Sequence, residues 1–453
     1  MEITRFAPSP TGHLHLGGAR TALFSYLFAK ANNGKFLLRF EDTDQERSKQ
    51  EFVESIMKSL DWMKIKIDSE PVYQSKNLAK HKQLALELYE KGFAYACDCS
   101  EETLTKMREE QIAKKQKPKY DGLNRNNNIE YAEGMVLRFK FPLEGVSRFE
   151  DLILGDIAIN NKEFDDFIIL RSDGSPTYNF SAAVDDMEMD ITTVIRGDDH
   201  ITNTLKQINV LEALGATIPN YAHLPMVLAE SGKRLSKRDG AEDILDYKRK
   251  GYLNDALINY LVRLGWSHGE EEIFSIDKLQ EIFNLSDVNS SPSKYSQDLL
   301  DWYNNKYLNF LTPEELIVKL KENSEVDFSQ IKNGILAISL LAKGASSLNQ
   351  IAEESIYFFE EPLISKDLLN IDSEKKILLS EFASQLKKID FEKNTIEEFI
   401  KKFLTANNLK FPVLGKPLRL MLTGKENAPS ISELLYILGK ETSLKRIEYT
   451  LND

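Results

Sequence analysis

Two segments far apart in the sequence carry residues suited to binding phosphate. The first, residues 5–20, reads Arg-Phe-Ala-Pro-Ser-Pro-Thr-Gly-His-Leu-His-Leu-Gly-Gly-Ala-Arg. His13 and His15 precede a predicted helix, whose N-terminal N–H groups and partial positive charge favour an anion. Gly17 and Gly18 have no side chain, so a flat ring or a phosphate could lie against their backbone. The segment therefore predicts a nucleotide site.

The second segment, residues 230–240, reads Glu-Ser-Gly-Lys-Arg-Leu-Ser-Lys-Arg-Asp-Gly and holds four cations within the six residues from Lys233 to Arg238. A glycine-flanked cationic loop after a strand suits a negatively charged, transient group such as a triphosphate. An ordinary surface loop can have the same composition. Ser236, which lies between the cations, favours the phosphate interpretation.

The elements that must position these segments alternate between strand and helix. Residues 2–7 can form a buried strand, residues 8–12 a tight turn, and an amphipathic helix runs from Leu16 to a stop at residues 33–34. A second buried strand, residues 36–40, leads into Glu41-Asp-Thr-Asp44, at the end of a strand where α/β proteins bind ligands. Asp44 is better explained as the N-cap of the next helix. Glu41 is the ligand candidate.

The alternation stops between residues 97 and 174, which we interpret as an insertion in the sheet domain containing short β-like pieces. The basic stretch 114–119 could contact a phosphodiester backbone, but a solvated face is the favoured interpretation. Alternation then resumes, with a helix at 202–214 and a strand at 224–228. From residue 243 the pattern is helical, and a polar break at 286–294 predicts a linker.

Composition excludes several classes of protein. The chain has 453 residues, 42% hydrophobic and 28% charged, which predicts a globular protein of several domains. No apolar run reaches transmembrane length and no signal peptide is visible, so we expect a cytoplasmic protein without a membrane partner. The net charge of -13 argues against non-specific nucleic-acid affinity but permits a local basic track. Hydrolase elbows, Walker loops and dinucleotide glycine fingerprints are absent from the sequence.

Cys97 and Cys99 invite a zinc interpretation. A structural zinc site needs four ligands, yet these are the only cysteines, and no histidine lies between His81 and His200. Two ordinary thiols in a compact turn are therefore favoured, and no metal ligand is assigned.

Both phosphate-binding segments resemble signatures of class I aminoacyl-tRNA synthetases. His15-Leu-Gly-Gly18 matches the HIGH signature, and Arg234-Leu-Ser-Lys-Arg238 matches KMSKS with arginine in place of its first lysine. Further segments narrow the resemblance to bacterial-type glutamyl-tRNA synthetases: residues 5–12, 40–44, 117–122, 176–180, 184–186, 302–304, 416–419 and 423–424. One departure concerns zinc, because the zinc-binding members have a further cysteine where this chain reads Leu123-Asn-Arg125.

The resemblance implies an α/β Rossmann-like catalytic domain of the HIGH/KMSKS type with an inserted α+β connective domain, followed by an all-α anticodon-binding region. The implied boundaries are 1–96 and 175–240 for the catalytic halves, 97–174 for the acceptor-binding insertion, 241–305 for a stem-contact helical domain and 306–453 for the anticodon-binding region.

The implied activity is ATP-dependent ligation of L-glutamate to tRNA through a glutamyl-adenylate, with Mg²⁺, by a monomer. Whether tRNA-Glu, tRNA-Gln or both are charged stays open, as do the anticodon-reading residues and the need for bound tRNA during activation. Two alternatives have the same fold: a tRNA-modifying glutamyl transferase and a non-catalytic tRNA-binding paralogue.

The resemblance also implies roles for individual residues. His15 and Lys237 would stabilise the transition state of adenylate formation. The ATP-binding set comprises Pro8, Thr11, Gly12, His13, His15, Gly17, Gly18, Asp199, Leu235, Ser236 and Lys237. The glutamate-binding set comprises Arg5, Ser9, Glu41, Tyr178 and Arg196. The arginines would take the side-chain carboxylate and Glu41 the ammonium group. His13 is equally compatible with a solvated surface position.

Overall fold

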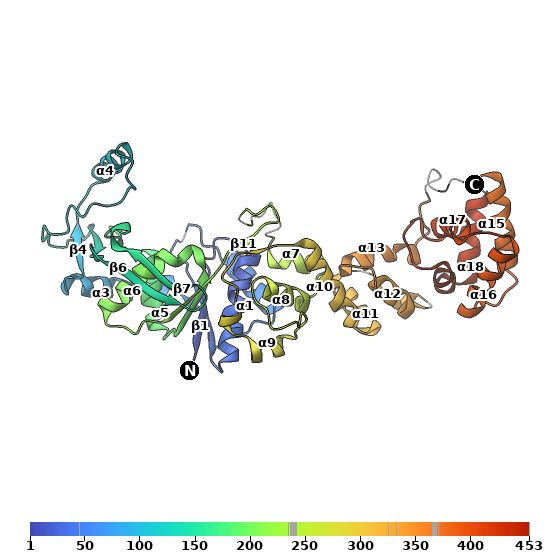
Figure 1. Ribbon diagram of the computed structural model, residues 1–453, viewed down its shortest axis with the longest axis horizontal. Coiled ribbons are helices and arrows are strands. Elements are labelled where there is room, and N and C mark those ends of the chain that lie inside the picture. Colours follow the sequence, from blue (N-terminus) through green and yellow to red (C-terminus); the bar gives the residue numbers. More distant parts are fainter. Residues whose placement is uncertain are drawn as a thin grey trace. The chain divides into compact units, whose positions relative to one another are not determined.

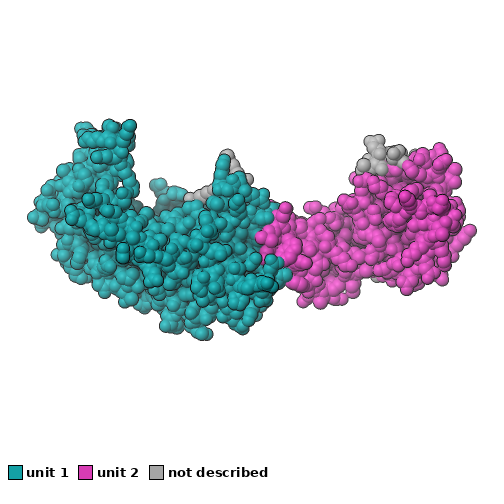
Figure 2. Space-filling view, in the orientation of Figure 1, with its two compact units in different colours: residues 1–246, 257–297 teal, residues 247–256, 298–453 magenta. Residues whose placement is uncertain are grey.

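The computed structural model divides into two compact units, coloured in Figure 2. Unit 1 consists of residues 1–246 and 257–297, and unit 2 of residues 247–256 and 298–453. The structure describes residues 1–44, 46–233, 235, 242–324, 326–331, 333–364, 369 and 371–452. The proposed KMSKS residues Arg234, Ser236 and Lys237 lie outside the described residues.

Unit 1 contains a mixed sheet with the strand order β3-β2-β1-β9-β10-β6-β7 (Figure 1). Neighbouring strands are parallel except β6 and β7, which form an antiparallel hairpin. The strands are β1 (Ile3–Phe6), β2 (Lys35–Phe40), β3 (Val72–Tyr73), β6 (Val146–Asp151), β7 (Gly155–Asn160), β9 (Thr193–Gly197) and β10 (Asn220–Leu224). Strand order reverses between β1 and β9, and open α/β sheets bind ligands at such a switch point.

The first helix, α1 (Leu16–Ala31), is buried on nearly every side and is not the amphipathic helix expected. It packs on β1 and β2 and also against α9 (Ile276–Ile282), and Phe24 makes an edge-to-face contact with Phe283. Because protein covers it on both sides, its N-terminus is held firmly at the sheet edge.

Unit 1 contains further helices. They are α2 (Gln50–Trp62), α3 (Leu78–Glu90), α4 (Glu101–Ala113), α5 (Tyr178–Glu188) and α6 (Ile201–Leu214). Of these, α4 projects away from the sheets (Figure 1). The helices α7 (Ile244–Arg249) and α8 (Asn254–Arg263) cross the sequence limits of the two units.

Residues 97–174 do not form a separate compact unit. A three-stranded antiparallel sheet, β4 (Ala94–Cys97), β5 (Val136–Phe139) and β8 (Ile168–Leu170), shares one apolar core with α3, α5 and α6. The hairpin β6–β7 instead extends the main sheet, because β6 pairs with β10. The expected insertion is therefore joined to the catalytic sheet through its own strands, and its boundaries stay a prediction.

The strand expected at residues 224–228 is interrupted. Pro225 lacks the N–H that would continue the ladder, and β10 ends at Leu224. The next strand, β11 (Val227–Leu228), pairs with β12 (Ser293–Lys294). Residues 286–294, the polar stretch expected to be a linker, thus belong to unit 1. The limit of this compact unit falls after residue 297.

Unit 2 is helical in its described residues. Its helices are α10 (Gln297–Phe310, whose first residue belongs to unit 1), α11 (Pro313–Asn323), α12 (Gly334–Ala342), α13 (Leu348–Phe359), α15 (Ser373–Leu386), α16 (Lys393–Ala406), α17 (Phe411–Thr423) and α18 (Ile431–Asn452). Gly439 interrupts α18 with a positive φ of 77°. The expected α/β domain followed by a helical region is confirmed. Among the described helices, none is long and apolar enough to cross a membrane.

Candidate active site

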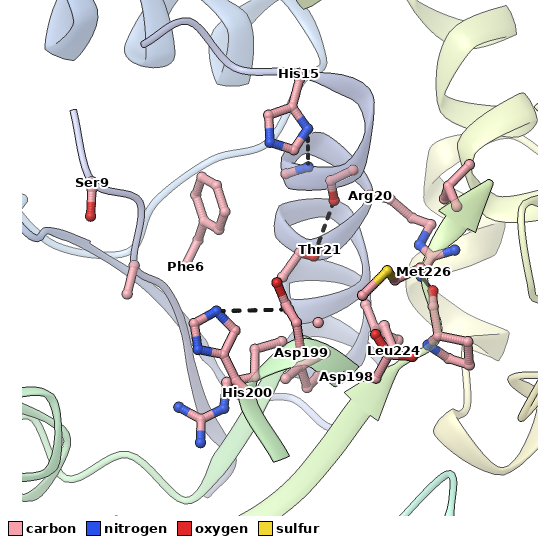
Figure 3. A pocket seen from close by; sticks show the side chains of 18 of the residues that line it. Phe6, Ser9, His15, Arg20, Thr21, Asp198, Asp199, His200, Leu224 and Met226 are labelled. Carbon is pink, nitrogen blue, oxygen red and sulfur yellow. Dashed lines mark hydrogen bonds and ion pairs between the residues drawn. The ribbon is translucent and has the colours of Figure 1, made fainter. Parts of the chain in front are cut away.

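A cavity of about 580 Å³ opens at the carboxyl ends of β1, β9 and β10, beside the start of α1 (Figure 3). Its walls come from segments that are distant in sequence, from Arg5 on β1 to Leu235 after β11. The parallel pairing of β1 with β2 and β9 brings the carboxyl ends of these strands to one edge. The cavity therefore occupies the switch point of the sheet.

His15 caps the first turn of α1 with its side chain. Its Nδ1 accepts a hydrogen bond from the backbone N–H of Gly18 over 3.2 Å, as the dashed line in Figure 3 shows. Since Nδ1 accepts, the proton of the neutral ring is on Nε2, which can donate. A side chain at position 17 would crowd this ring, because a Cβ on Gly17 would lie 3.2 Å from His15 Cε1.

Arg5, which lines the cavity, belongs to a buried network of charges. Its Nε and Nη2 donate to the two carboxylate oxygens of Asp186 over 2.9 and 3.2 Å. Nη1 of Arg39 donates to the same carboxylate over 2.6 Å. Burial raises the pKa of Asp186, but the guanidinium groups of Arg39 and Arg5 outweigh that effect and lower it to about 2. Asp186 is thus ionised at neutral pH and orients Arg5.

Glu41 is a nearly buried carboxylate at the end of β2. Nη2 of Arg39 donates to its Oε1 over 3.2 Å, and the Glu41 side chain is 9% exposed. Burial raises the pKa of Glu41 above its usual value, although Arg39 and Arg5 oppose this. A cation that entered the cavity would favour the ionised form. Glu41 therefore suits an ammonium group.

Arg196 reaches the cavity from the end of β9. Its Nη2 donates to Thr204 Oγ1 over 2.6 Å, and its Nε lies 3.4 Å from Nε2 of His223. Its Nη1 is buried and has no hydrogen-bond partner among the described residues. A guanidinium with an unused buried donor suits a carboxylate ligand.

Tyr178 and His200 also line the cavity. The Tyr178 hydroxyl lies 3.2 Å from Nδ1 of His200, and Nδ2 of Asn203 lies at the same distance from that nitrogen. Burial and then the charge of Arg196 lower the pKa of His200, so its ring is neutral near pH 7. Asp199 is next to it and lies 3.9 Å from its Nε2.

The cavity brings together most of the residues implied by the resemblance: Arg5, Ser9, His15, Gly17, Gly18, Glu41, Tyr178, Arg196, Asp199 and Leu235. Pro8, Thr11, Gly12 and His13 do not line it. The ring of His13 is turned towards α2, where its Nδ1 lies 2.8 Å from Ser55 Oγ. Ser236 and Lys237 lie outside the described residues.

Sequence reasoning gave no role to several residues at or beneath the cavity: Arg20, Thr21, Asp198, His200, Asn203 and Met226 in its wall, and Asp186, Thr204, His223 and Asp151 beneath it. Asp186 belongs to the matched segment 184–186, which was the one available signal. Asp151 and His223 lie in unremarkable strands, and only the folded sheet joins them.

The two cysteines lie in a hydrogen-bonded cluster. The sulfur atoms of Cys97 and Cys99 lie 3.6 and 3.7 Å from the Tyr120 hydroxyl, and the Cys99 thiol donates to Asn124 Oδ1 over 3.2 Å. Nδ2 of Asn124 is bonded to Asp98. The groups around the two thiols are therefore a phenol and an amide, and this donor set does not fit zinc. Among the described residues, no group of three or more His, Cys, Asp or Glu side chains is arranged to hold a metal ion.

Comparisons with known proteins agree along the whole chain. Residues 3–302 match the family described as tRNA synthetases class I (E and Q), catalytic domain, and residues 297–451 match an anticodon binding domain. A glutamate–tRNA ligase of Nitrosospira multiformis is 44% identical over 99% of this chain and 98% of its own length. A glutamate–tRNA ligase of Nitrosomonas europaea is 45% identical over 99% of this chain and 98% of its own length. The crystal structure of a glutamate tRNA ligase from Elizabethkingia meningosepticum, in complex with its amino acid, has a TM-score of 0.89 at 31% identity and covers 100% of this chain and 99% of that one.

Proposed function

The chain belongs to the class I tRNA synthetase family for glutamate and glutamine, and we propose that it ligates L-glutamate to tRNA at the expense of ATP. In the first step the α-carboxylate of glutamate attacks the α-phosphorus of ATP, which forms glutamyl-adenylate and releases pyrophosphate. In the second, a ribose hydroxyl of the terminal tRNA adenosine attacks the acyl carbon and AMP leaves. The observation that carries the proposal is the convergence of Arg5, Arg196, Glu41 and His15 on one cavity at the sheet switch point.

The charges in the cavity suit the three charged groups of glutamate. Arg5 and Arg196 take the side-chain carboxylate, because a forked guanidinium matches a carboxylate in shape and charge. Glu41 takes the ammonium group, and the charge of that group lowers the raised pKa of Glu41. Ser9 and Tyr178, both in the cavity wall, supply hydroxyl groups to the same ligand. The α-carboxylate is thereby left to face ATP.

ATP lies along the start of α1 in this proposal. Gly17 and Gly18 leave space for its flat base or its phosphates over the backbone. The Nε2–H of His15 donates to the phosphate that becomes more negative as the carboxylate attacks. Lys237 of the KMSKS segment shares this role. Pro8, Thr11, Gly12 and His13 belong to the turn before His15 and remain in the proposed ATP-binding set, although they do not line the cavity.

The cation of the reaction enters as the magnesium complex of ATP, because Mg²⁺ is usually held by substrate phosphates and water with few protein ligands. Asp198 and Asp199 in the cavity wall are the carboxylates available to its water shell. We assign no zinc to the insertion, since the partner of the Cys99 thiol is the amide of Asn124 and not a further thiolate.

Transfer RNA is the second substrate. The match of residues 297–451 to an anticodon binding domain supports a role for the helices of unit 2 at the anticodon, and the segment 97–174 is assigned to the acceptor end. We further propose that the protein acts as a monomer in the cytoplasm. No observation favours a tRNA-modifying transferase or a non-catalytic paralogue.

The test is glutamate-dependent ATP–pyrophosphate exchange with tRNA present, followed by charging of purified tRNA-Glu and tRNA-Gln. Arg5→Ala should raise the KM for glutamate at least tenfold more than the KM for ATP, because a charge-assisted hydrogen bond to the amino acid is lost. An equal rise in both values would remove Arg5 from the amino-acid site. Absence of exchange with the unaltered protein would overturn the proposed function itself.

A further inference from the structure

The guanidinium of Arg196 is held by neutral groups, unlike that of Arg5. Arg5 and Arg39 share the carboxylate of Asp186. Arg196 donates instead to the hydroxyl of Thr204 and to the imidazole of His223. The Arg196 side chain lines the cavity and the residue is only 6% exposed, while its Nη1 lacks a partner among the described residues.

The hydrogen bonds of His223 fix which of its nitrogens accepts. Its Nδ1 lies 2.6 Å from Asp151 Oδ2 and must carry the proton, because a carboxylate only accepts. Asp151 also accepts from the backbone N–H groups of His223, Ile153 and Leu154, so it cannot turn away. The lone pair of Nε2 therefore faces Arg196 and Thr204. Burial lowers the pKa of His223 despite the opposing charge of Asp151, which keeps the ring neutral.

Thr204 completes the arrangement from α6. Its Oγ1 accepts from Nη2 of Arg196 over 2.6 Å and lies 2.9 Å from Nε2 of His223, to which it can donate. The backbone carbonyl of His200, at 3.3 Å, is its other acceptor. Two of the three guanidinium nitrogens of Arg196 thus have partners within the protein, and Nη1 has none among the described residues.

We propose that Thr204 and His223 are positioning residues for the amino-acid substrate, which hold Arg196 so that its Nη1 is kept for the side-chain carboxylate. This rests on the function proposed above. A carboxylate in the place of Thr204 would hold Arg196 as well but would compete with the ligand for its charge. Neutral acceptors fix the direction of the guanidinium and leave its charge available.

The decisive pair of variants is Thr204→Val and Thr204→Ser. Valine keeps the shape of threonine but removes the acceptor of Nη2, whereas serine keeps the hydroxyl. In ATP–pyrophosphate exchange with tRNA present, Thr204→Val should raise the KM for glutamate about tenfold, the loss expected for one hydrogen bond to a charged group. The KM for ATP should change less than twofold, and Thr204→Ser should stay close to the unaltered protein. An unchanged KM for glutamate, or an equal rise for both substrates, would overturn the proposal.

A second pair tests His223 in the same assay. The amide oxygen of His223→Gln can reach the position of Nε2, so this variant keeps an acceptor for Arg196. The shorter His223→Asn can replace only the Nδ1 donor to Asp151. We expect the asparagine variant to raise the KM for glutamate at least fivefold more than the glutamine variant, with thermal melting as a control for folding. If both variants lower the melting temperature equally and the KM for glutamate is unchanged, His223 has only a structural role. Normal exchange by the unaltered protein separates that result from a failure of the proposed function.

Discussion

Removal of the Asp186 carboxylate should strongly lower the stability of unit 1. Its carboxylate accepts from both Arg5 and Arg39, and all three residues are at most 4% exposed. Asp186→Asn would keep the shape of the side chain but leave two guanidinium groups facing a neutral amide. Removing one partner of a buried ion pair costs about 3–5 kcal/mol, because the remaining charge is buried without compensation.

The titration of Asp186 gives a second, independent magnitude. Its pKa is about 2 in the folded protein, against an ordinary value of 3.8. A depressed carboxyl pKa stabilises the fold fully above the ordinary value, and that contribution is lost as the pH falls through the folded value. The difference corresponds to roughly 2 kcal/mol at neutral pH. The two figures agree within a factor of about two. Unaltered protein should therefore lose stability between about pH 4 and pH 2, and Asp186→Asn should lose less over that range.

The assay is urea unfolding followed by tryptophan fluorescence in a Trp302→Phe background. The chain has three tryptophans, and the other two, Trp62 and Trp266, are in unit 1, so the signal reports this unit.

The matched control is Glu87→Gln. Lys91 Nζ lies 2.6 Å from Glu87 Oε1, the same separation as Arg39 and Asp186, but these side chains are 49% and 38% exposed. The control substitution should lower the free energy of unfolding by less than about 0.5 kcal/mol. If Asp186→Asn lowers the free energy of unfolding by no more than Glu87→Gln does, burial does not strengthen the ion pair and the reasoning fails.

Two further predictions concern the cysteine cluster and the KMSKS segment. Asn124→Cys places a third thiolate beside Cys97, Cys99 and the Tyr120 hydroxyl, so the variant should retain about one zinc per chain after dialysis, measured by elemental analysis. Stoichiometric zinc in the unaltered protein would contradict the ligand count. Lys237→Ala should slow pyrophosphate exchange about a hundredfold or more while the affinity for tRNA changes little. An unchanged exchange rate would remove Lys237 from the transition state.

Local patterns allowed the elements around the cavity to be predicted from sequence. The strand before residue 8, the turn and the helix starting at Leu16 follow from apolar spacing, Pro and Gly. The second strand and the position of Glu41 at its end follow in the same way. Pairing of the strands was harder, because β6 lies within the predicted insertion yet pairs with β10. Strand partners are decided by long-range packing, which a local pattern does not contain.

The residues that orient the ligand-binding arginines could not be predicted from the sequence, for a related reason. The family resemblance assigned Arg5 to the carboxylate of the ligand, but its partner Asp186 is 181 positions away. His223 and Asp151 are 72 positions apart, and neither has a local pattern that distinguishes it from a core residue. Residue type suggests which groups bind a ligand, because the ligand's chemistry demands them. The groups that orient those residues are determined only by the geometry of the fold.

The difference between the two arginines follows from charge balance in a buried site. Arg5 and Arg39 face Asp186 and Glu41, so this group of four is neutral when both carboxylates are ionised. Arg196 adds one charge that no directly bonded carboxylate cancels. The side-chain carboxylate of glutamate can pair with that charge, whereas the neutral amide of glutamine cannot. A low-dielectric cavity penalises an uncompensated charge. On the proposed function, the neutral partners of Arg196 therefore let the site prefer glutamate to glutamine, a preference that a carboxylate in the place of Thr204 would abolish.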